Sequence, residues 1–207
     1  MERLGLKKVR LSINLGIVGM EGTGKELFIQ YLNNIAIKSV HNQNIYEYLI
    51  LYEKIPFKIK LFIVEHLDQL ITEKPKLKNF DGLIISIDIY DTQSINQYTP
   101  STINKFINYY NFHGLTVLAA VDSYYLEKGV PSEYFRISRL NLINKTNQLN
   151  FIYCFEIQNK NGDIKEVLEQ MFNDILLRFQ TSSPELLEHA KNYGQDLLMK
   201  QNLNKNG

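Results

Sequence analysis

The sequence predicts an α/β domain in which helices cover both faces of a mostly parallel sheet. Three observations lead to this class. Several apolar, β-branched runs have the length of buried strands, segments with helical apolar spacing separate the later ones, and a glycine-rich turn follows the first run. Together they predict a three-layer arrangement around a six-stranded sheet with one antiparallel edge strand.

The predicted strands are short apolar runs between turn residues, and they cover residues 9–18, 45–53, 57–64, 82–90, 115–121 and 151–157. Residues 54–56 join two of these runs as a tight turn, and this hairpin supplies the antiparallel edge. The predicted helices have apolar residues three and four positions apart, and they cover residues 26–34, 101–110, 132–149 and 163–179. Ser132 and Asp163 are the candidate N-caps of the last two.

A further helix is predicted from residue 184 to about residue 201. The preceding residues, Thr181-Ser182-Ser183-Pro184, place a capping side chain before a proline at the first helical position. The 207 residues exceed one ordinary domain of about 150 residues. We therefore expect a main domain over residues 1–180 and a helical extension over residues 181–207.

The composition excludes several classes of protein. A net charge of +1 gives no overall field to attract nucleic acid, so no nucleic-acid partner is expected. No apolar run reaches the length of a membrane span, and the first twenty residues lack the pattern of a signal peptide. Neither end carries a lipidation pattern, so no lipid anchor is expected. With Cys154 as its single cysteine, the chain fits a reducing, cytoplasmic setting.

Four of the eleven glycines fall within nine positions, and they point to a phosphate-binding loop. The segment Gly19-Met20-Glu21-Gly22-Thr23-Gly24-Lys25 fits the pattern G-x-x-x-x-G-K between a predicted strand and a predicted helix. Glycines let backbone N–H groups turn toward phosphate oxygens, the helix N-terminus adds its dipole, and the lysine supplies a positive charge. The candidate phosphate-binding residues are Gly19, Glu21, Gly22, Thr23, Gly24, Lys25 and Glu26.

Glu26 occupies the position at which this pattern usually has Ser or Thr as a Mg²⁺ ligand. A carboxylate is also a hard oxygen ligand and could bind Mg²⁺ directly. It also brings a negative charge close to the phosphates, and two like charges about 4 Å apart repel by on the order of 4 kcal/mol at an effective dielectric constant near 20. The other interpretation is that Glu26 is simply a favourable residue for the first turn of a helix.

The order of loop, helix, hairpin and alternating strands resembles the Ras-like small GTPases of the P-loop NTPase superfamily. The resemblance runs from about residue 9 to residue 179. After the loop, its clearest stretch is residues 79–91, which look like the fourth-strand segment of Rab and Arf proteins, where a turn with Asp81-Gly82 leads into an apolar strand. The resemblance implies a guanine-nucleotide switch with Mg²⁺ as cofactor, and protein effectors or regulators that contact its switch regions.

The family's second signature, D-x-x-G-Q, falls on Glu65-His66-Leu67-Asp68-Gln69. By resemblance, Glu65 replaces the aspartate that holds Mg²⁺, so Glu26 and Glu65 are the candidate metal ligands. Gln69 takes the place of the catalytic glutamine that positions water. Asp68 replaces a glycine and adds negative charge near the triphosphate, which is expected to slow hydrolysis.

The family's base-reading signatures are partly retained. Asp122 matches the aspartate that accepts hydrogen bonds from guanine, although Ala119 and Ala120 replace the other two residues of that motif. After the last strand, Asn159 and Lys160 match the loop that contacts the base. Asp122 could also be an ordinary turn residue at a strand end.

The sequence departs from the small-GTPase motifs at several functional positions, so more than one function remains open. The switch I segment, residues 35–46, contains no threonine for Mg²⁺. His41 and His66 suggest a metal site, but they lack a frame of cysteines or acids. The first expectation is a guanine-nucleotide switch with weak GTP hydrolysis, and the alternative is a pseudo-GTPase that acts as a protein-binding scaffold. A nucleotide kinase is disfavoured, because the chain has five arginines and no lid insertion.

Overall fold

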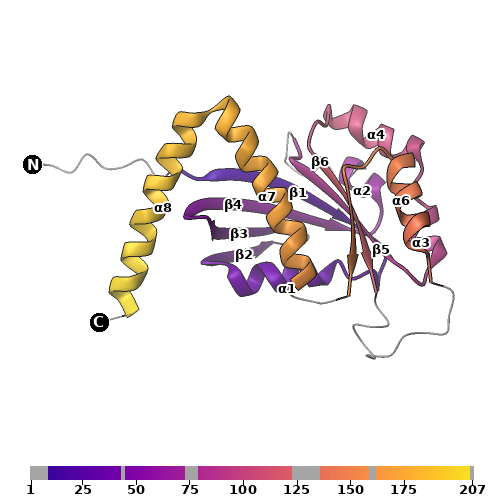
Figure 1. Ribbon diagram of the computed structural model, residues 1–207, viewed down its shortest axis with the longest axis horizontal. Helices are drawn as coiled ribbons and strands as arrows, with labels where there is room; N and C mark the ends of the chain where they lie inside the picture. Colours follow the sequence, from indigo (N-terminus) through magenta and orange to yellow (C-terminus); the bar gives the residue numbers. More distant parts are fainter. Residues whose placement is uncertain (1–8, 43–44, 73–78, 123–135, 159–161, 206–207) are drawn as a thin grey trace, which may run out of the picture.

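The computed structural model describes residues 9–42, 45–72, 79–122, 136–158 and 162–205, with side chains up to residue 200. Seven strands form one sheet in the order β2-β3-β4-β1-β5-β6-β7 (Figure 1). Their bounds are Leu11–Val18 (β1), Lys38–Asn42 (β2), Ile45–Tyr52 (β3), Ile55–Val64 (β4), Gly82–Asp88 (β5), Leu115–Val121 (β6) and Tyr153–Ile157 (β7). The predicted α/β class is therefore confirmed, with one strand more than the six expected.

The extra strand is β2, and it changes which strand forms the edge. β3 pairs antiparallel with both β2 and β4, while β1, β4, β5, β6 and β7 run parallel. The predicted antiparallel strand is thus inside the sheet, and the prediction that it forms the edge is wrong. All five residues of β2 are exposed. The sequence Lys-Ser-Val-His-Asn has no buried face, so it lacks the apolar alternation by which strands are recognised.

The helices lie in the connections between the strands. Their bounds are Glu26–Ile35 (α1), Leu67–Thr72 (α2), Thr92–Asn96 (α3), Pro100–Tyr110 (α4), Arg139–Gln148 (α6), Gly162–Ser182 (α7) and Pro184–Lys205 (α8). Helix α6 begins seven residues after the predicted start, because Ser138 caps it by accepting a hydrogen bond from the Asn141 N–H. Ser132, the predicted cap, lies outside the described residues. Asp163 lies in the first turn of α7 and is not its N-cap.

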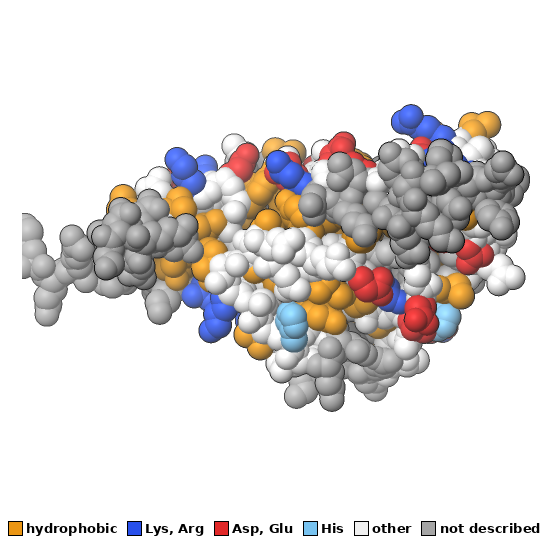
Figure 2. Space-filling model, turned by 90° about the horizontal axis from the view of Figure 1, so that it is seen from below, with side chains coloured by type: hydrophobic (Ala, Val, Ile, Leu, Met, Phe, Trp, Pro, Cys, Tyr) orange, Lys and Arg blue, Asp and Glu red, His pale blue; other side chains and the backbone are white. Residues whose placement is uncertain are grey.

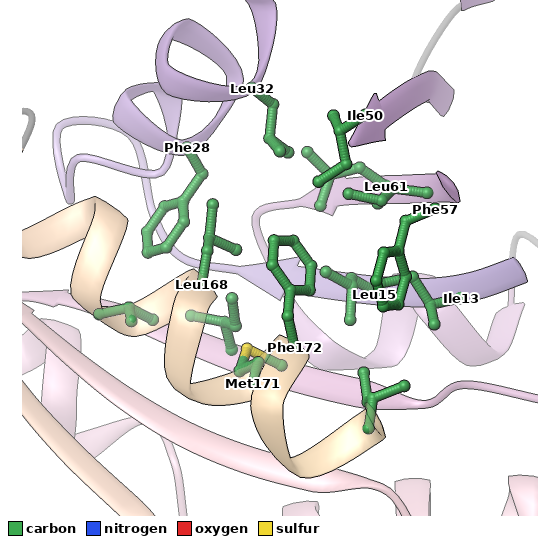
Figure 3. Close-up of a cluster of buried hydrophobic side chains, with 14 of the residues drawn as sticks. Ile13, Leu15, Phe28, Leu32, Ile50, Phe57, Leu61, Leu168, Met171 and Phe172 are labelled. Atoms are coloured by element: carbon green, nitrogen blue, oxygen red, sulfur yellow. The ribbon is translucent and has the colours of Figure 1, made fainter. Parts of the chain in front are cut away.

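Two hydrophobic clusters lie on opposite faces of the sheet. On one face α1, α7 and α8 cover β1, β3 and β4. Figure 3 shows Phe28 of α1 beside Leu168 of α7, and Phe172 of α7 pointing toward Leu15 of the sheet. On the other face α2, α3, α4 and α6 pack on the C-terminal halves of β4 and β1 and on β5 and β6. Every residue of β6 is buried, as a central strand covered on both faces requires.

Helix α8 packs across the start of β4, as Figure 1 shows. Leu187, Ala190 and Tyr193 are buried in this contact. A side chain at Gly194 would overlap the carbonyl oxygen of Lys54, so the helix approaches the β3–β4 turn backbone to backbone. The predicted terminal helix is therefore present, and it packs on the domain. No helix in the described ranges is both long enough and apolar enough to cross a membrane.

Candidate functional site

The glycine-rich segment, residues 19–25, joins the C-terminal end of β1 to the start of α1. We call it the glycine loop. Strand β1 lies between β4 and β5. The connection that leaves β1 and leads to β4 runs through α1 on one face of the sheet, and the connection from β4 to β5 runs through α2 on the other face. In open parallel sheets the crevice beyond the strand ends at such a point is the usual ligand site. The glycine loop therefore lies where this topology places a ligand.

Each loop glycine has a separate structural reason. Gly22 and Gly24 have φ of 80° and 77°, a left-handed conformation that favours glycine. A side chain at Gly24 would approach Val121 Cγ1 of β6 to 2.7 Å, and one at Gly19 would approach the carbonyl oxygen of Ser86 of β5 to 2.6 Å. A side chain at Gly22 would meet open space. The loop is thus packed against the sheet at two glycines and open at the third.

Hydrogen bonds fix the loop in this shape. The Thr23 hydroxyl donates to the carbonyl of Met20 over 2.8 Å, and the Ser86 hydroxyl of β5 donates to the carbonyl of Thr23 over 2.6 Å. Thr23 and Ser86 are both buried. The sequence analysis missed Ser86, yet a polar residue inside the apolar run of β5 is a detectable signal, because a buried hydroxyl needs a partner.

Lys25 is the buried cation of the loop. The residue is only 6% exposed, and its Nζ donates a hydrogen bond of 2.6 Å to the carbonyl oxygen of Gly19. Lys25 also precedes the first residue of α1, where backbone N–H groups lack partners within the helix. The lysine charge and the helix N-terminus therefore face the same short loop.

Glu21 and Glu26 are exposed at the loop and at the first turn of α1. The remaining exposed residues of α1 are uncharged: Gln30, Asn33, Asn34 and Ile35. Figure 2 shows the side of the molecule on which α1 lies, and most charged side chains there gather around the margins. Among the described residues of the loop and α1, the charge is therefore supplied by Glu21, Lys25 and Glu26 together with the α1 dipole.

The end of β4 adjoins the loop, since the Gly19 N–H donates to the Val64 carbonyl over 3.1 Å. Gln69 Oε1 accepts hydrogen bonds from the backbone N–H groups of Glu65 (3.0 Å) and His66 (2.8 Å). Asp68 pairs with Lys105 of α4 over 2.8 Å. The amide of the predicted catalytic residue thus binds its own turn, and the negative charge of Asp68 has a cationic partner.

Asp122 follows β6 directly after Val121, the residue against which Gly24 packs. It is 4% exposed, and its N–H donates to the Ile157 carbonyl of β7 over 2.9 Å. The Tyr90 hydroxyl, just beyond β5, donates to Asp122 Oδ2 over 3.4 Å. Burial, and next the Asp122 charge, raise the pKa of Tyr90, so this phenol remains a donor at neutral pH.

The structure thus brings the glycine loop, the Glu65–Gln69 turn and Asp122 together at the C-terminal ends of the parallel strands β1, β4 and β6. The other two base-site candidates, Asn159 and Lys160, lie outside the described residues. Tyr90 was missed by the sequence analysis. Its position two residues beyond Asp88, beside the strand that Asp122 follows, could have indicated it, because neighbouring parallel strands have their C-terminal ends together.

No group of three or more His, Cys, Asp or Glu residues suited to a metal ion occurs in the described part of the chain. The ring of His41 contacts Tyr46 edge to face, at 4.8 Å between centroids. A separate cavity of about 520 Å³ lies between α3 and α6, with Asn96, Asn141 and Lys145 in its lining. No predicted site residue lines that cavity.

The chain was also compared with known proteins. No protein-family model matches it, and the search of curated proteins finds no relative.

Proposed function

We propose that this protein binds a guanine nucleotide through the glycine loop and acts as a molecular switch with weak GTP hydrolysis. The observation that carries the proposal is the loop itself. Two left-handed glycines and a buried lysine stand between a central parallel strand and a helix N-terminus. Inward-facing backbone N–H groups, a helix dipole and one cation are the means by which proteins hold a nucleotide's phosphates.

In this proposal Lys25 exchanges the Gly19 carbonyl for phosphate oxygens. The exchange replaces a neutral acceptor with a charged one, and charge-assisted hydrogen bonds are the stronger kind. The space beside Gly22 admits phosphate oxygens close to the backbone. Thr23 stays tied to Met20 and Ser86, so the loop keeps its shape as the ligand enters.

Mg²⁺ would be held by Glu26 and Glu65 together with the phosphates. Mg²⁺ commonly takes only one or two carboxylates in such sites and fills its octahedron with phosphate oxygens and water. Glu26 and Glu65 are exposed carboxylates, so their donor chemistry suits this ion, and a cage made of protein ligands alone is not needed. When bound, the ion neutralises phosphate charge.

Asp122 is proposed to accept hydrogen bonds from the N–H groups of guanine. Its backbone is fixed to β7, and its carboxylate lies in a buried position where such a contact is strong. Adenine presents no matching pair of donors on that edge, so a carboxylate here favours guanine. Tyr90 keeps a donor against the same carboxylate when the base is absent.

Slow hydrolysis follows from the turn after β4. Gln69 already accepts two backbone hydrogen bonds, so its amide must leave the Glu65–Gln69 turn before it can orient water.

The engagement of Gln69 in its own turn also favours the second candidate function, a scaffold with no chemical cycle. In that case nucleotide binding stabilises the fold, and partner proteins are recognised without hydrolysis.

Titration with fluorescent GDP, GTP and ATP analogues, with and without Mg²⁺, tests the proposal. We expect saturable binding that prefers guanine, is weakened by about tenfold to a hundredfold in Lys25→Met and is unchanged in Lys191→Met, a control at an exposed lysine of α8. Asp122→Asn should remove the preference for guanine while phosphate-dependent binding remains. Absence of binding at millimolar nucleotide contradicts the proposal, and equal affinity for ATP contradicts its guanine part. Binding without turnover favours the scaffold.

A further inference from the structure

One half of a sheet face is not covered by any described helix. Strand β4 shows the boundary, because its side chains on this face change from Lys58 and Lys60 to the buried Phe62 and Val64. The last two belong to the cluster packed under α2, whereas the lysine side chains are 37% and 35% exposed. The helical layer therefore ends partway along β4.

Cationic side chains gather on this open half. Lys58 lies opposite Leu49 of β3, which in turn lies opposite Lys38 of β2. Arg10 precedes β1 on the other side of β4. Glu47 is the acidic residue between them, with ion pairs to Lys58 at 2.8 Å and Lys60 at 3.2 Å. We call this surface the basic groove, and it is formed by Arg10, Lys38, Val40, Glu47, Leu49, Lys58 and Lys60.

The basic groove concentrates charge that the whole chain lacks. Its four cations and one carboxylate give a local charge of +3, against +1 for the full sequence. Hydrogen bonding to Lys58 lowers the pKa of Glu47, so that carboxylate stays ionised and neutralises one cation at most. The surface thus retains a positive potential that favours an anionic partner.

Helix α8 fixes the cation at one end of the groove. The Arg10 guanidinium donates from Nη2 to the Tyr193 hydroxyl over 3.3 Å and lies 5.8 Å from the centre of that ring. The docked C-terminal helix therefore holds Arg10 at the groove, which lowers the entropy that Arg10 loses when it binds an anion.

The groove also has an apolar centre. A hollow of about 190 Å³ is lined by Val40, Tyr48 and Leu49 together with the charged residues Arg10, Lys38, Glu47 and Lys58. Val40 is 43% exposed, a large fraction for a valine on a sheet. A partner that contacts the cations on both sides therefore covers apolar surface between them.

The spacing of the cations decides the kind of ligand. Arg10 precedes β1, Lys58 and Lys60 lie on β4, and Lys38 lies on β2, so the cations span the width of four adjacent strands, β1-β4-β3-β2. At about 4.8 Å per strand, this width is about 14 Å, more than one phosphate group can span. An extended peptide with carboxylates at intervals matches both this width and the apolar centre.

We propose that the basic groove docks an acidic segment of a partner protein. Carboxylates of that segment pair with Arg10, Lys38 and Lys58, and an apolar side chain fills the hollow beside Leu49. Residues of the glycine loop do not line the groove, so this proposal stands independently of nucleotide binding.

A random-peptide display selection on the immobilised full chain tests the proposal. We expect the selected peptides to carry an excess of Asp and Glu, and a labelled synthetic peptide of the commonest sequence to bind the protein in solution. Each exposed charge pair contributes up to about fivefold in affinity, so the double variant Lys38→Gln/Lys58→Gln should weaken binding by about tenfold. Added salt should weaken it further.

Two further variants separate charge from misfolding. Glu47→Gln removes the one carboxylate of the groove and should tighten peptide binding, a gain that a damaged fold does not produce. Lys191→Gln removes an exposed cation of α8 and should leave binding unchanged. The proposal is overturned if the selected peptides carry no acidic excess, if Lys191→Gln weakens binding as much as the double variant, or if vesicles rich in phosphatidylserine bind the groove and the peptides do not.

Discussion

Lys25 and Gly19 form the closest link within the glycine loop, a hydrogen bond of 2.6 Å from the lysine Nζ to the glycine carbonyl oxygen. The two residues stand at opposite ends of the loop, so this one contact closes it into a ring around the open position at Gly22. The ammonium group is buried but held by a neutral acceptor, which is a weaker partner than an anion. The loop is therefore prepared to accept a phosphate in place of its own carbonyl.

Lys25→Met tests this arrangement, since Met keeps the aliphatic stem and removes the charge. We expect the free energy of unfolding to change by no more than about 1.5 kcal/mol, because the lost hydrogen bond is offset by the removal of a buried charge. Nucleotide affinity should fall by about tenfold to a hundredfold, as for other hydrogen bonds to charged groups. Urea unfolding and a nucleotide titration measure the two effects. A large loss of stability without loss of affinity contradicts the assigned role.

Gly22 and Gly24 form a matched pair for a test of loop packing. Both have positive φ, so an alanine at either position pays the same conformational cost of about 1–2 kcal/mol. Only Gly24→Ala also places a methyl group 2.7 Å from Val121 Cγ1. We therefore expect Gly24→Ala to lower the free energy of unfolding by about 1–3 kcal/mol more than Gly22→Ala. Urea denaturation of the two variants measures the difference, and equal losses contradict the packing argument.

The parts of the fold that the sequence predicts are those in which burial leaves a pattern. Strand β6 is predicted to the residue, because it is covered on both faces and reads as a continuous apolar run. Strand β2 is not predicted, because an exposed edge strand buries nothing and shows no alternation. Helix α2 is not predicted either, because its six residues are too few for two turns of apolar spacing.

The candidate site divides in the same way. The glycine loop is visible in the sequence, since positive φ favours glycine at positions 22 and 24 and close packing against Val121 also restricts Gly24. The Tyr90–Asp122 contact is not, because it joins residues 32 positions apart through the alignment of strand ends. The pairing of Asp68 with Lys105 also depends on how α2 and α4 pack, so the sequence alone presents Asp68 as an uncompensated charge.

Tyr48 gives a prediction for alkaline pH. Its hydroxyl is buried and has no hydrogen-bond partner among the described residues, and burial raises the pKa of Tyr48 to about 12. The folded state thus keeps a proton that the unfolded chain releases near pH 10, and this contribution to stability is lost as pH rises from 10 to about 12. Tyr48→Phe should remove that part of the pH dependence. At neutral pH it should leave stability unchanged or raise it by about 1 kcal/mol, because an unpaired buried hydroxyl is removed.

Thermal unfolding at pH 8 and pH 11, of wild type and Tyr48→Phe, measures the effect of this phenol. Tyr109→Phe is the control, since Tyr109 is 51% exposed. A destabilisation by Tyr48→Phe at neutral pH of more than about 1 kcal/mol contradicts the expectation, because it reveals a partner for the hydroxyl.

Gly194 tests how α8 is held on the domain. Gly→Ala inside a helix ordinarily stabilises it by about 1 kcal/mol. Here the new methyl group would overlap the Lys54 carbonyl oxygen, and a backbone group cannot move aside as a flexible side chain does. We expect Gly194→Ala to lower stability by about 1–3 kcal/mol or to release α8. Limited proteolysis and hydrogen exchange of α8 report its release, and the exposed neighbour Gln195→Ala should change neither.

Glu26 decides how the glycine loop treats Mg²⁺, and two substitutions separate its possible roles. If its charge repels phosphate, both Glu26→Ser and Glu26→Gln should tighten nucleotide binding in EDTA, where Mg²⁺ cannot screen the repulsion, by up to several hundredfold for the full repulsion of about 4 kcal/mol. Glu26→Ser should also tighten binding in Mg²⁺, because a serine hydroxyl is the ligand usual at this position.

If Glu26 instead binds the ion, Glu26→Gln should weaken binding in Mg²⁺ alone, since an amide oxygen is a poorer Mg²⁺ ligand than a carboxylate. Nucleotide titrations in both buffers distinguish these outcomes, with Glu185→Gln on α8 as the control for a change in net charge. Unchanged affinity in both buffers contradicts both roles and leaves Glu26 as a helix-start residue whose carboxylate points to solvent.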